Sequence, residues 1–498
     1  MRHLTQLNVL ADSTVNGLSN TGGTLQLSVP EVFGALLAIG LVLVVAKLIR
    51  RRVSVFRRLF LPASIIGGLL VLLLGPQVLG RIVTLLGGPE LLANGVLSES
   101  VEQVWSQLPV ILINVVFAAL FLGKPIPGIR KVWQLAGPQA AFGQSVAWGQ
   151  YVVGITLGLL VLSPIFGMSP MAGALIEIGF QGGHGTSAGL VDTFEAFGFA
   201  EGTDLALGLA TIGLISGVLF GTAIVNWGVR TGRLTLTESG DPKLANDDDE
   251  EFDDFDERED VPERDGTTDP LSLHFGFVAV AIAIGWLMLE ALTALEQATW
   301  AADGGFELLT HVPLFPMAML GGAALQIVID RTGIFAIDRQ LMNRISGTAL
   351  DLIIVAALGT LSLTAIGGNL APFVILAVAG IAWNIGAFLL LAPRIIPTYA
   401  YERGLGDFGQ SMGMTVTGLL LMRMADPDNK SGAFEAFGYK QLLFEPVVGG
   451  GLFTAASIPL IAQLGPVPVL LGATVLTVFW IVFGIRNFGA KQNRQETH

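Results

Sequence analysis

Long apolar stretches dominate the pattern of hydrophobic and polar positions along this chain. From residue 30 almost to the C-terminus, runs of about 20 apolar residues recur, and an α-helix of that length crosses the hydrocarbon core of a bilayer. Because the apolar positions are continuous and do not alternate with polar ones, the pattern predicts membrane-spanning helices and not a β-barrel. Eleven spans are predicted, at 30–49, 59–80, 104–123, 138–166, 203–228, 273–296, 311–330, 349–366, 371–393, 443–463 and 466–485.

Two further apolar segments, 168–190 and 404–422, are interrupted by glycines and polar residues. Non-helical backbone lies at membrane depth only where protein or a water-filled cavity satisfies its polar groups. We therefore predict that each segment is a re-entrant hairpin, which enters and leaves the membrane on the same side.

Composition agrees with a membrane protein. The chain has 498 residues, of which 52% are hydrophobic and 13% are charged, and its mean hydropathy is +0.67. It contains no cysteine, which excludes thiol catalysis, cysteine-bound iron–sulfur clusters and disulfides. Residues 1–29 are mixed and polar and lack the basic-then-apolar layout of a cleavable signal, so we expect them to form an exposed tail.

The net charge of −13 is concentrated in one short segment. Residues 247–265 hold 13 acidic side chains against Arg258 and Arg264. Such a run is typical of a solvated, disordered linker, and we assign residues 229–272 to it. A role in cation binding or regulation is the open alternative.

The basic residues predict the orientation in the inner membrane, since cytoplasmic loops carry the excess of Lys and Arg. If the first span runs from outside to inside, only Arg2 and Arg81 of the 27 basic residues fall outside. Lys440 is then one of the cytoplasmic residues. The N-terminus is predicted outside, and the acidic linker and the C-terminus are predicted in the cytoplasm.

The two halves of the chain repeat short motifs in the same order. LPASIIGG at 61–68 matches FPMAMLGG at 315–322, and FEAFG occurs at both 194–198 and 434–438. Between these motifs, QGGHGTSAGL at 181–190 matches QSMGMTVTGL at 410–419. Three matches in order indicate a duplication.

The duplication predicts an all-α polytopic membrane protein with two repeats, at 30–228 and 273–463. Each repeat holds five spans and one hairpin, so the second repeat is inverted relative to the first. Inverted repeats are the architecture of many secondary transporters. The remaining residues, 464–498, supply one extra transmembrane helix and a C-terminal tail.

The two hairpins hold the candidate binding residues. Glycines there let the backbone approach a ligand, exposed N–H groups suit a carboxylate, and carbonyl and hydroxyl oxygens suit a hard cation such as Na⁺. The alternative is that the small residues only allow close helix packing. The candidates are Gln181, Gly182, Gly183, His184, Gly185, Thr186 and Ser187 in the first hairpin, and Gln410, Ser411, Gly413, Thr415 and Thr417 in the second. A sodium site is predicted among Thr186, Ser187, Thr415 and Thr417.

Several other polar residues have two interpretations. His184 can relay protons or bond a carbonyl group, and Glu177 is either an acid inside the membrane or an interfacial residue. Asp351 and Glu445 each open a predicted span, where the helix dipole favours an acid. Polar side chains within the spans are predicted to hydrogen-bond between helices, and these are Asn114, Gln144, Gln150, Thr211, Asn369 and Asn384.

Enzyme motifs give little support to a catalytic function. The sequence contains no HExxH, no GxSxG and no Walker A motif. GLGD at 404–407 matches the GxGD motif of intramembrane aspartyl proteases, but the Tyr-Asp pair that they also need occurs nowhere in the sequence. We therefore expect a transporter and not an enzyme, with no organic cofactor and no nucleic-acid partner.

The motif GGHGT at 182–186 resembles the first hairpin of the bacterial sodium/glutamate symporter family. Three more stretches are similar, namely 61–70, ATIGLISG at 210–217 and the second hairpin at 409–418, so the resemblance covers roughly residues 30–465. It implies a Na⁺-coupled carrier of glutamate that forms a homodimer among membrane lipids.

The resemblance also implies that a transport domain with both hairpins moves against a scaffold. Substrate and sodium positions would come from residues 182–187 and 409–417. The second hairpin is less rich in glycine than the family pattern, and the acidic linker and the eleventh span are additions. The alternatives are a Na⁺- or H⁺-coupled carrier of another small carboxylate, an ion channel, and the GxGD protease.

Overall fold

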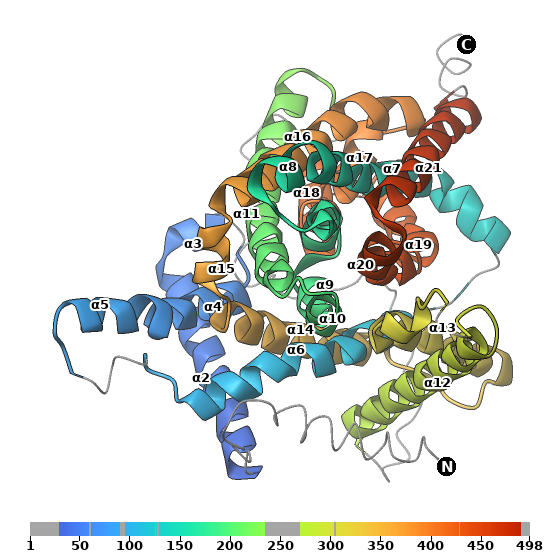
Figure 1. Ribbon diagram of the computed structural model, residues 1–498. Helices are drawn as coiled ribbons and strands as arrows, with labels where there is room; N and C mark the ends of the chain where they lie inside the picture. The colour runs from blue at the N-terminus through green and yellow to red at the C-terminus, as the bar shows by residue number, and fades with distance from the viewer. Residues whose placement is uncertain are drawn as a thin grey trace.

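The computed structural model describes residues 29–58, 61–89, 95–124, 126, 129–234, 269–302, 305–427 and 429–489. The predicted N-terminal tail apart from Val29, most of the acidic linker and the C-terminal tail beyond residue 489 lie outside the described residues. The described residues form helices, turns and loops, and none of them forms a strand (Figure 1).

Helices in the first half follow the predicted spans, and short helices lie in the segment 168–190. They are α2 (Val29–Arg52), α3 (Ser54–Arg58), α4 (Ala63–Leu74), η1 (Pro76–Gly80), α5 (Arg81–Leu85), α6 (Glu99–Ala119), α7 (Ile129–Leu157), η3 (Gly158–Leu162), α8 (Ser163–Phe166), η4 (Pro170–Ala174), η5 (Glu177–Gln181), α9 (Gly183–Gly189), α10 (Val191–Ala196) and α11 (Glu201–Arg230).

The second half begins after the linker. Its helices are α12 (Pro270–Ala298), η6 (Leu309–His311), α13 (Leu314–Thr332), α14 (Arg339–Gly359), α15 (Leu363–Gly368), α16 (Leu370–Ile395), α17 (Ala400–Gln410), α18 (Thr415–Ala425), α19 (Ala433–Phe444), α20 (Leu452–Leu464) and α21 (Pro466–Asn487).

Within the described part of the chain, ten helices are long and apolar enough to cross a membrane. The prediction that 443–463 forms one continuous span is wrong. α19 ends at Phe444, α20 has only 13 residues, and residues 445–451 between them are not helical. Pro446 lacks a backbone N–H and the three glycines at 449–451 have low helix propensity, so this stretch interrupts the helix.

The predicted span at 349–366 is shifted. α14 begins at Arg339, because the side chain of Asp338 accepts the backbone N–H groups of Gln340 and Leu341 at 2.8 and 3.3 Å and caps the helix. Asp351 therefore lies in the middle of α14 and not at a helix N-terminus.

The helices form two groups in space (Figure 1). A peripheral group consists of α2, α4, α6, α12, α13 and α14, in which α6 packs on α14 and α12 packs on α13. A central group consists of α7, α11 and α16 to α21 together with the segments from η4 to α10. Helix α9 of the central group contacts α6 and α14 of the peripheral group.

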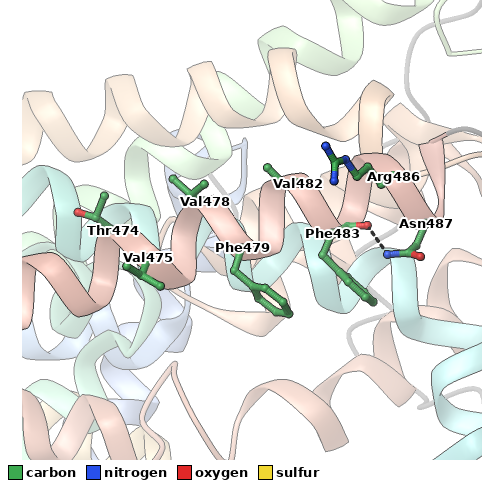
Figure 2. Close-up of a pocket in the computed structure, with 8 residues that line it drawn as sticks. All are labelled: Thr474, Val475, Val478, Phe479, Val482, Phe483, Arg486 and Asn487. Atoms are coloured by element: carbon green, nitrogen blue, oxygen red, sulfur yellow. Dashed lines mark hydrogen bonds between the residues drawn. The ribbon is translucent and has the colours of Figure 1, made fainter.

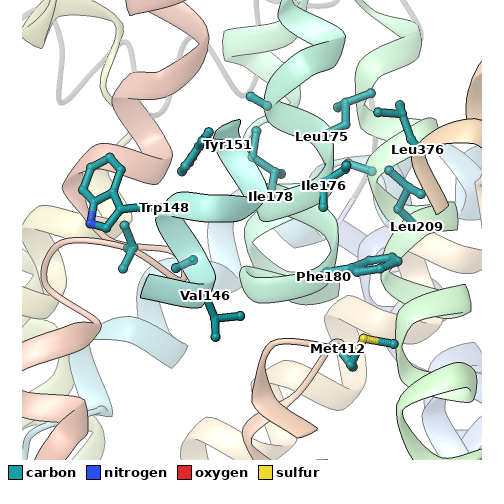
Figure 3. Close-up of a cluster of buried hydrophobic side chains, with 14 of the residues drawn as sticks. Val146, Trp148, Tyr151, Leu175, Ile176, Ile178, Phe180, Leu209, Leu376 and Met412 are labelled. Carbon is teal, nitrogen blue, oxygen red and sulfur yellow. The ribbon is translucent and has the colours of Figure 1, made fainter. Parts of the chain in front are cut away.

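The largest buried apolar cluster lies mainly in the central group (Figure 3). Phe180 of η5 and Met412, which follows α17, belong to this cluster together with Trp148 and Tyr151 of α7. Because the polar backbone of short helices is enclosed by these side chains, the broken segments of the central group lie in the protein interior and not against lipid.

A shallow groove of about 610 Å³ runs along the outer face of α21 (Figure 2). Val475 and Phe479 on this face are 67% and 50% exposed. An exposed apolar face on a membrane-spanning helix is the expected surface for lipid, and the groove contains none of the residues predicted to bind a ligand.

Candidate binding site at three helix breaks

Three interruptions of helices in the central group supply irregular backbone. The first break lies at Gly182, between η5 and the start of α9 at Gly183. The second lies at 411–414 between α17 and α18, and the third at 445–451 between α19 and α20. Gly183 has a φ of 72° and Gly450 a φ of 99°, which are values that favour glycine. At such breaks, backbone N–H and C=O groups are available to a ligand.

The first and second breaks touch each other. A Cβ atom on Gly183 would lie 2.6 Å from the carbonyl oxygen of Gly413, so no larger residue fits without movement of the backbone. The two segments predicted as hairpins therefore meet at their central glycines. That each one returns to the side of the membrane from which it came stays a prediction.

Two side chains hold the backbone of the second break. Gln150 of α7 and Asn384 of α16 each donate a hydrogen bond to the carbonyl oxygen of Ser411, at 2.9 and 2.8 Å, and Gln150 also donates to Asn384 at 2.9 Å. The prediction that these two residues bond between helices is confirmed. Their bonds satisfy a carbonyl group that a helix would otherwise have paired.

Glu177 connects the first half to the third break. Its carboxylate accepts hydrogen bonds from the Gly449 backbone N–H at 2.8 Å, the Thr454 hydroxyl at 2.9 Å and the Tyr151 hydroxyl at 2.5 Å. The side chain is fully buried within the protein, and its depth in the membrane stays a prediction. Three donors that point at the carboxylate satisfy its acceptor sites.

Polar side chains without partners lie beside the third break. Gln181 is 5% exposed and neither atom of its amide group has a hydrogen bond, and Thr186 is 1% exposed with an unpaired hydroxyl. A Cβ atom on Gly449 would lie 3.5 Å from Cγ of Gln181, and one on Gly450 would lie 2.7 Å from Oγ1 of Thr186. Because a buried polar atom without a partner is unfavourable, these groups are candidates for contact with a ligand.

His184 presents one free nitrogen. Its Nε2 lies 3.0 Å from the Thr211 hydroxyl, which itself donates to the Leu207 carbonyl at 3.0 Å. The hydroxyl proton is therefore used, so Nε2–H is the donor and Nδ1 is the unprotonated acceptor. The ring is 2% exposed and Nδ1 has no partner.

The remaining residues predicted to bind a ligand have structural contacts. The Ser187 hydroxyl donates to the Gly183 carbonyl of its own helix at 2.8 Å, and a Cβ atom on Gly185 would lie 2.8 Å from Ile113 of α6. Gly182 lies against Thr186, Thr415 begins α18, and Thr417 lies beside Gly217 of α11. The four-residue sodium site stays a prediction.

Gln410 belongs to a second polar cluster that sequence analysis missed. Its side-chain oxygen accepts a hydrogen bond from Lys440 at 2.6 Å, and Lys440 forms a 2.8 Å ion pair with Asp407. Lys440 is 1% exposed and lies within α19, so it does not lie in an exposed loop, and its predicted cytoplasmic side stays a prediction. It lies on α19, five residues before the third break at 445–451.

The described residues contain no group of three or more His, Cys, Asp or Glu side chains arranged to hold a metal ion. Oxygen atoms of the kind that bind a hard cation do lie near the breaks, and these are the amide oxygen of Gln181, the hydroxyl of Thr186 and the carboxylate of Glu177. Glu445, predicted at a helix N-terminus, instead follows the C-terminal end of α19.

Comparison with known proteins gives one family. Residues 106–422 match the family described as sodium/glutamate symporter, a region that contains the first and second breaks. The sodium/glutamate symporter of Escherichia coli (strain K12) is 27% identical over 323 residues, which are 61% of this chain and 73% of that relative. The sodium/glutamate symporter of Haemophilus influenzae is 28% identical over 227 residues, 42% of this chain and 52% of the relative. Because these relatives are named as symporters, the expectation of a transporter and not an enzyme is confirmed.

Proposed function

The chain belongs to the sodium/glutamate symporter family, and we propose that it is a multi-pass secondary transporter that carries glutamate, or a similar anionic amino acid, together with Na⁺. The observation that supports this site is the group of unpaired polar atoms on Gln181, His184 and Thr186 beside the helix breaks. A transporter must bind a polar substrate at membrane depth, and these atoms offer hydrogen bonds that the protein does not use itself.

An amino acid with two carboxylates matches these groups in chemistry. The Gln181 amide has both a donor, which suits a substrate carboxylate, and an acceptor, which suits the α-ammonium. The Thr186 hydroxyl and the backbone of the third break add further donors and acceptors. In this proposal Na⁺ binds to hydroxyl and carbonyl oxygens nearby, including Thr186.

Transport by an elevator-like, alternating-access mechanism agrees with the division into two groups of helices. Helix α9 meets the peripheral group through small and apolar residues, since Gly185 and Gly189 both lie against Ile113. A contact of small and apolar residues at this point favours sliding there. We propose that the central group moves with the substrate while the peripheral group stays fixed in the membrane and forms a homodimer.

The test is uptake of labelled glutamate into proteoliposomes under an inward Na⁺ gradient, with K⁺ and H⁺ gradients as comparisons. Accumulation above the external concentration with Na⁺ alone is the expected result. Accumulation with H⁺ alone, or of another carboxylate only, would favour the alternative carrier. Equilibration without accumulation would favour a channel.

A further inference from the structure

The GLGD motif at 404–407 has no role in the proposed binding site, yet its acid is completely enclosed. Asp407 of α17 is 0% exposed, and Lys440 of α19 is 1% exposed. Their side chains form an ion pair with 2.8 Å between Oδ1 and Nζ. Removal of two charges from water carries a large desolvation free energy, which the contacts around the pair must offset.

The groups around the ammonium share one electrostatic property. Oδ1 of Asp407 lies 2.8 Å away, the side-chain oxygen of Gln410 lies 2.6 Å away, and the centre of the Phe444 ring lies 3.8 Å away. A carboxylate oxygen, an amide oxygen and the face of an aromatic ring all present negative potential. Together they surround Nζ as ligands surround a bound cation.

The neighbouring helix is fitted closely to this arrangement. A Cβ atom on Gly143 of α7 would lie 2.9 Å from Oδ1 of Asp407 and 2.9 Å from Cε of Lys440. Arg403 also lies near Asp407, but its guanidinium donates to the carbonyl of Leu135 and the side chain of Gln139 at 3.3 Å each. The ammonium of Lys440 is thus the positive charge in direct contact with the carboxylate.

We propose that Asp407, Gln410 and Phe444 form a site for a small monovalent cation, and that the ammonium of Lys440 permanently occupies it. Lysine carries a compact point charge on a flexible stem, so its head group takes the place of a small ion. Gln410 is the last residue of α17 and directly precedes the second break at 411–414. Because the ammonium of Lys440 binds Gln410, it fixes the end of α17 beside that break, and no transported ion is needed for this role. This inference concerns the central group alone and does not depend on which substrate is carried.

Truncation of the lysine should open the site to free ions. In choline chloride, we expect Lys440→Ala to unfold at a lower thermal midpoint than the wild type. Addition of Na⁺ or methylammonium at about 100 mM should raise the midpoint of Lys440→Ala by at least roughly 3 °C more than it raises that of the wild type. In Lys440→Met, an apolar side chain still fills the cation site, so added cations should raise the thermal midpoint no more than in the wild type. Asp407→Asn leaves the ammonium without its carboxylate, so added cations should not restore its midpoint.

The comparison between variants decides the proposal. The double variant Asp407→Asn/Lys440→Ala should show only the Na⁺ response of the wild type, because the empty site has lost its charge. An ordinary structural ion pair predicts similar losses in both single variants and no rescue by cations. Failure of Lys440→Ala to respond, or to fold in either salt, would overturn the proposal. If the wild type showed no Na⁺-driven uptake, that result would contradict the proposed function. The difference in thermal midpoint between the variants would still test the cation site.

Discussion

The backbone N–H of Gly449 donates a 2.8 Å hydrogen bond to the carboxylate of Glu177, although the two residues are 272 positions apart in the sequence. This bond joins a short helix of the first half to the interruption of a helix in the second half. Because Thr454 and Tyr151 donate to the same carboxylate, one buried acid holds the third break in place. The proposed substrate groups, Gln181 and Thr186, lie beside that break.

Replacing Glu177 with glutamine should therefore impair transport. Gly449 and Thr454 share one carboxylate oxygen, whose place the amide oxygen can take, but the amide then turns an NH₂ group toward the Tyr151 hydroxyl. Each buried donor left unpaired costs about 1–3 kcal/mol. We expect uptake of glutamate to fall by at least roughly tenfold at equal amounts of folded protein, which corresponds to about 1.4 kcal/mol. Measurement of initial uptake rates in proteoliposomes checks this prediction.

Glu296 provides a matched control for that variant. It is also fully buried, and it accepts the backbone N–H groups of Leu308, Leu309 and Thr310 at 2.7 to 3.0 Å, but it lies on α12 of the peripheral group. Glu296→Gln should lower the thermal midpoint and keep the initial uptake rate of glutamate. Equal losses of uptake rate in both variants would contradict a special role for Glu177.

His184→Gln separates the two nitrogens of the ring. The amide NH₂ of glutamine can donate to the Thr211 hydroxyl in the place of Nε2, whereas the acceptor at Nδ1 is lost. If Nδ1 contacts substrate or a proton, the apparent affinity for glutamate should fall by about tenfold, as expected for one buried hydrogen bond. Unchanged affinity in this variant would remove His184 from the site.

Gly183→Ala tests the contact between the first two breaks. Both Gly183 and Gly167 have positive φ values, 72° and 68°, so alanine strains the backbone at either position by about 1 kcal/mol. Only at Gly183 would the new methyl meet an atom, the Gly413 carbonyl at 2.6 Å, whereas nothing lies within 4 Å at Gly167. We expect Gly167→Ala to retain uptake and Gly183→Ala to lose it, and similar uptake by both would show that the breaks do not need to touch.

The predicted orientation can be tested by labelling, because the chain has no native cysteine. A single cysteine in the acidic linker at 229–272 should react with a membrane-impermeant maleimide only from the cytoplasmic side. A cysteine in place of Asp303 should react only from outside. Reaction of both from the same side would rule out the inverted arrangement of the two repeats.

The sequence was sufficient to predict ten of the long helices and the role of Gln150 and Asn384, since hydropathy and polar residues within apolar runs are local signals. It did not predict the third break. Residues 443–463 have the length and hydropathy of a span, and glycine and proline are tolerated in membrane helices, so GGG at 449–451 did not indicate an interruption.

The burial of charged side chains was also beyond the sequence. Glu177 is buried because it packs against Tyr151 and the third break, which lie 26 and 272 positions away in the chain. The same is true of Lys440, because its burial depends on Asp407 of another helix. Both require tertiary contacts that hydropathy does not encode.

The most direct test of the site compares Na⁺-driven glutamate accumulation by the wild type, Thr186→Val and Thr477→Val in matched proteoliposomes. Both substitutions remove a buried hydroxyl with little change of shape, but the Thr477 hydroxyl already donates to the Ala473 carbonyl at 2.7 Å on α21, whereas the Thr186 hydroxyl has no partner. The account predicts accumulation by the wild type and Thr477→Val, and a loss of at least roughly tenfold in Thr186→Val. Full accumulation by Thr186→Val, or none by the wild type, would contradict it.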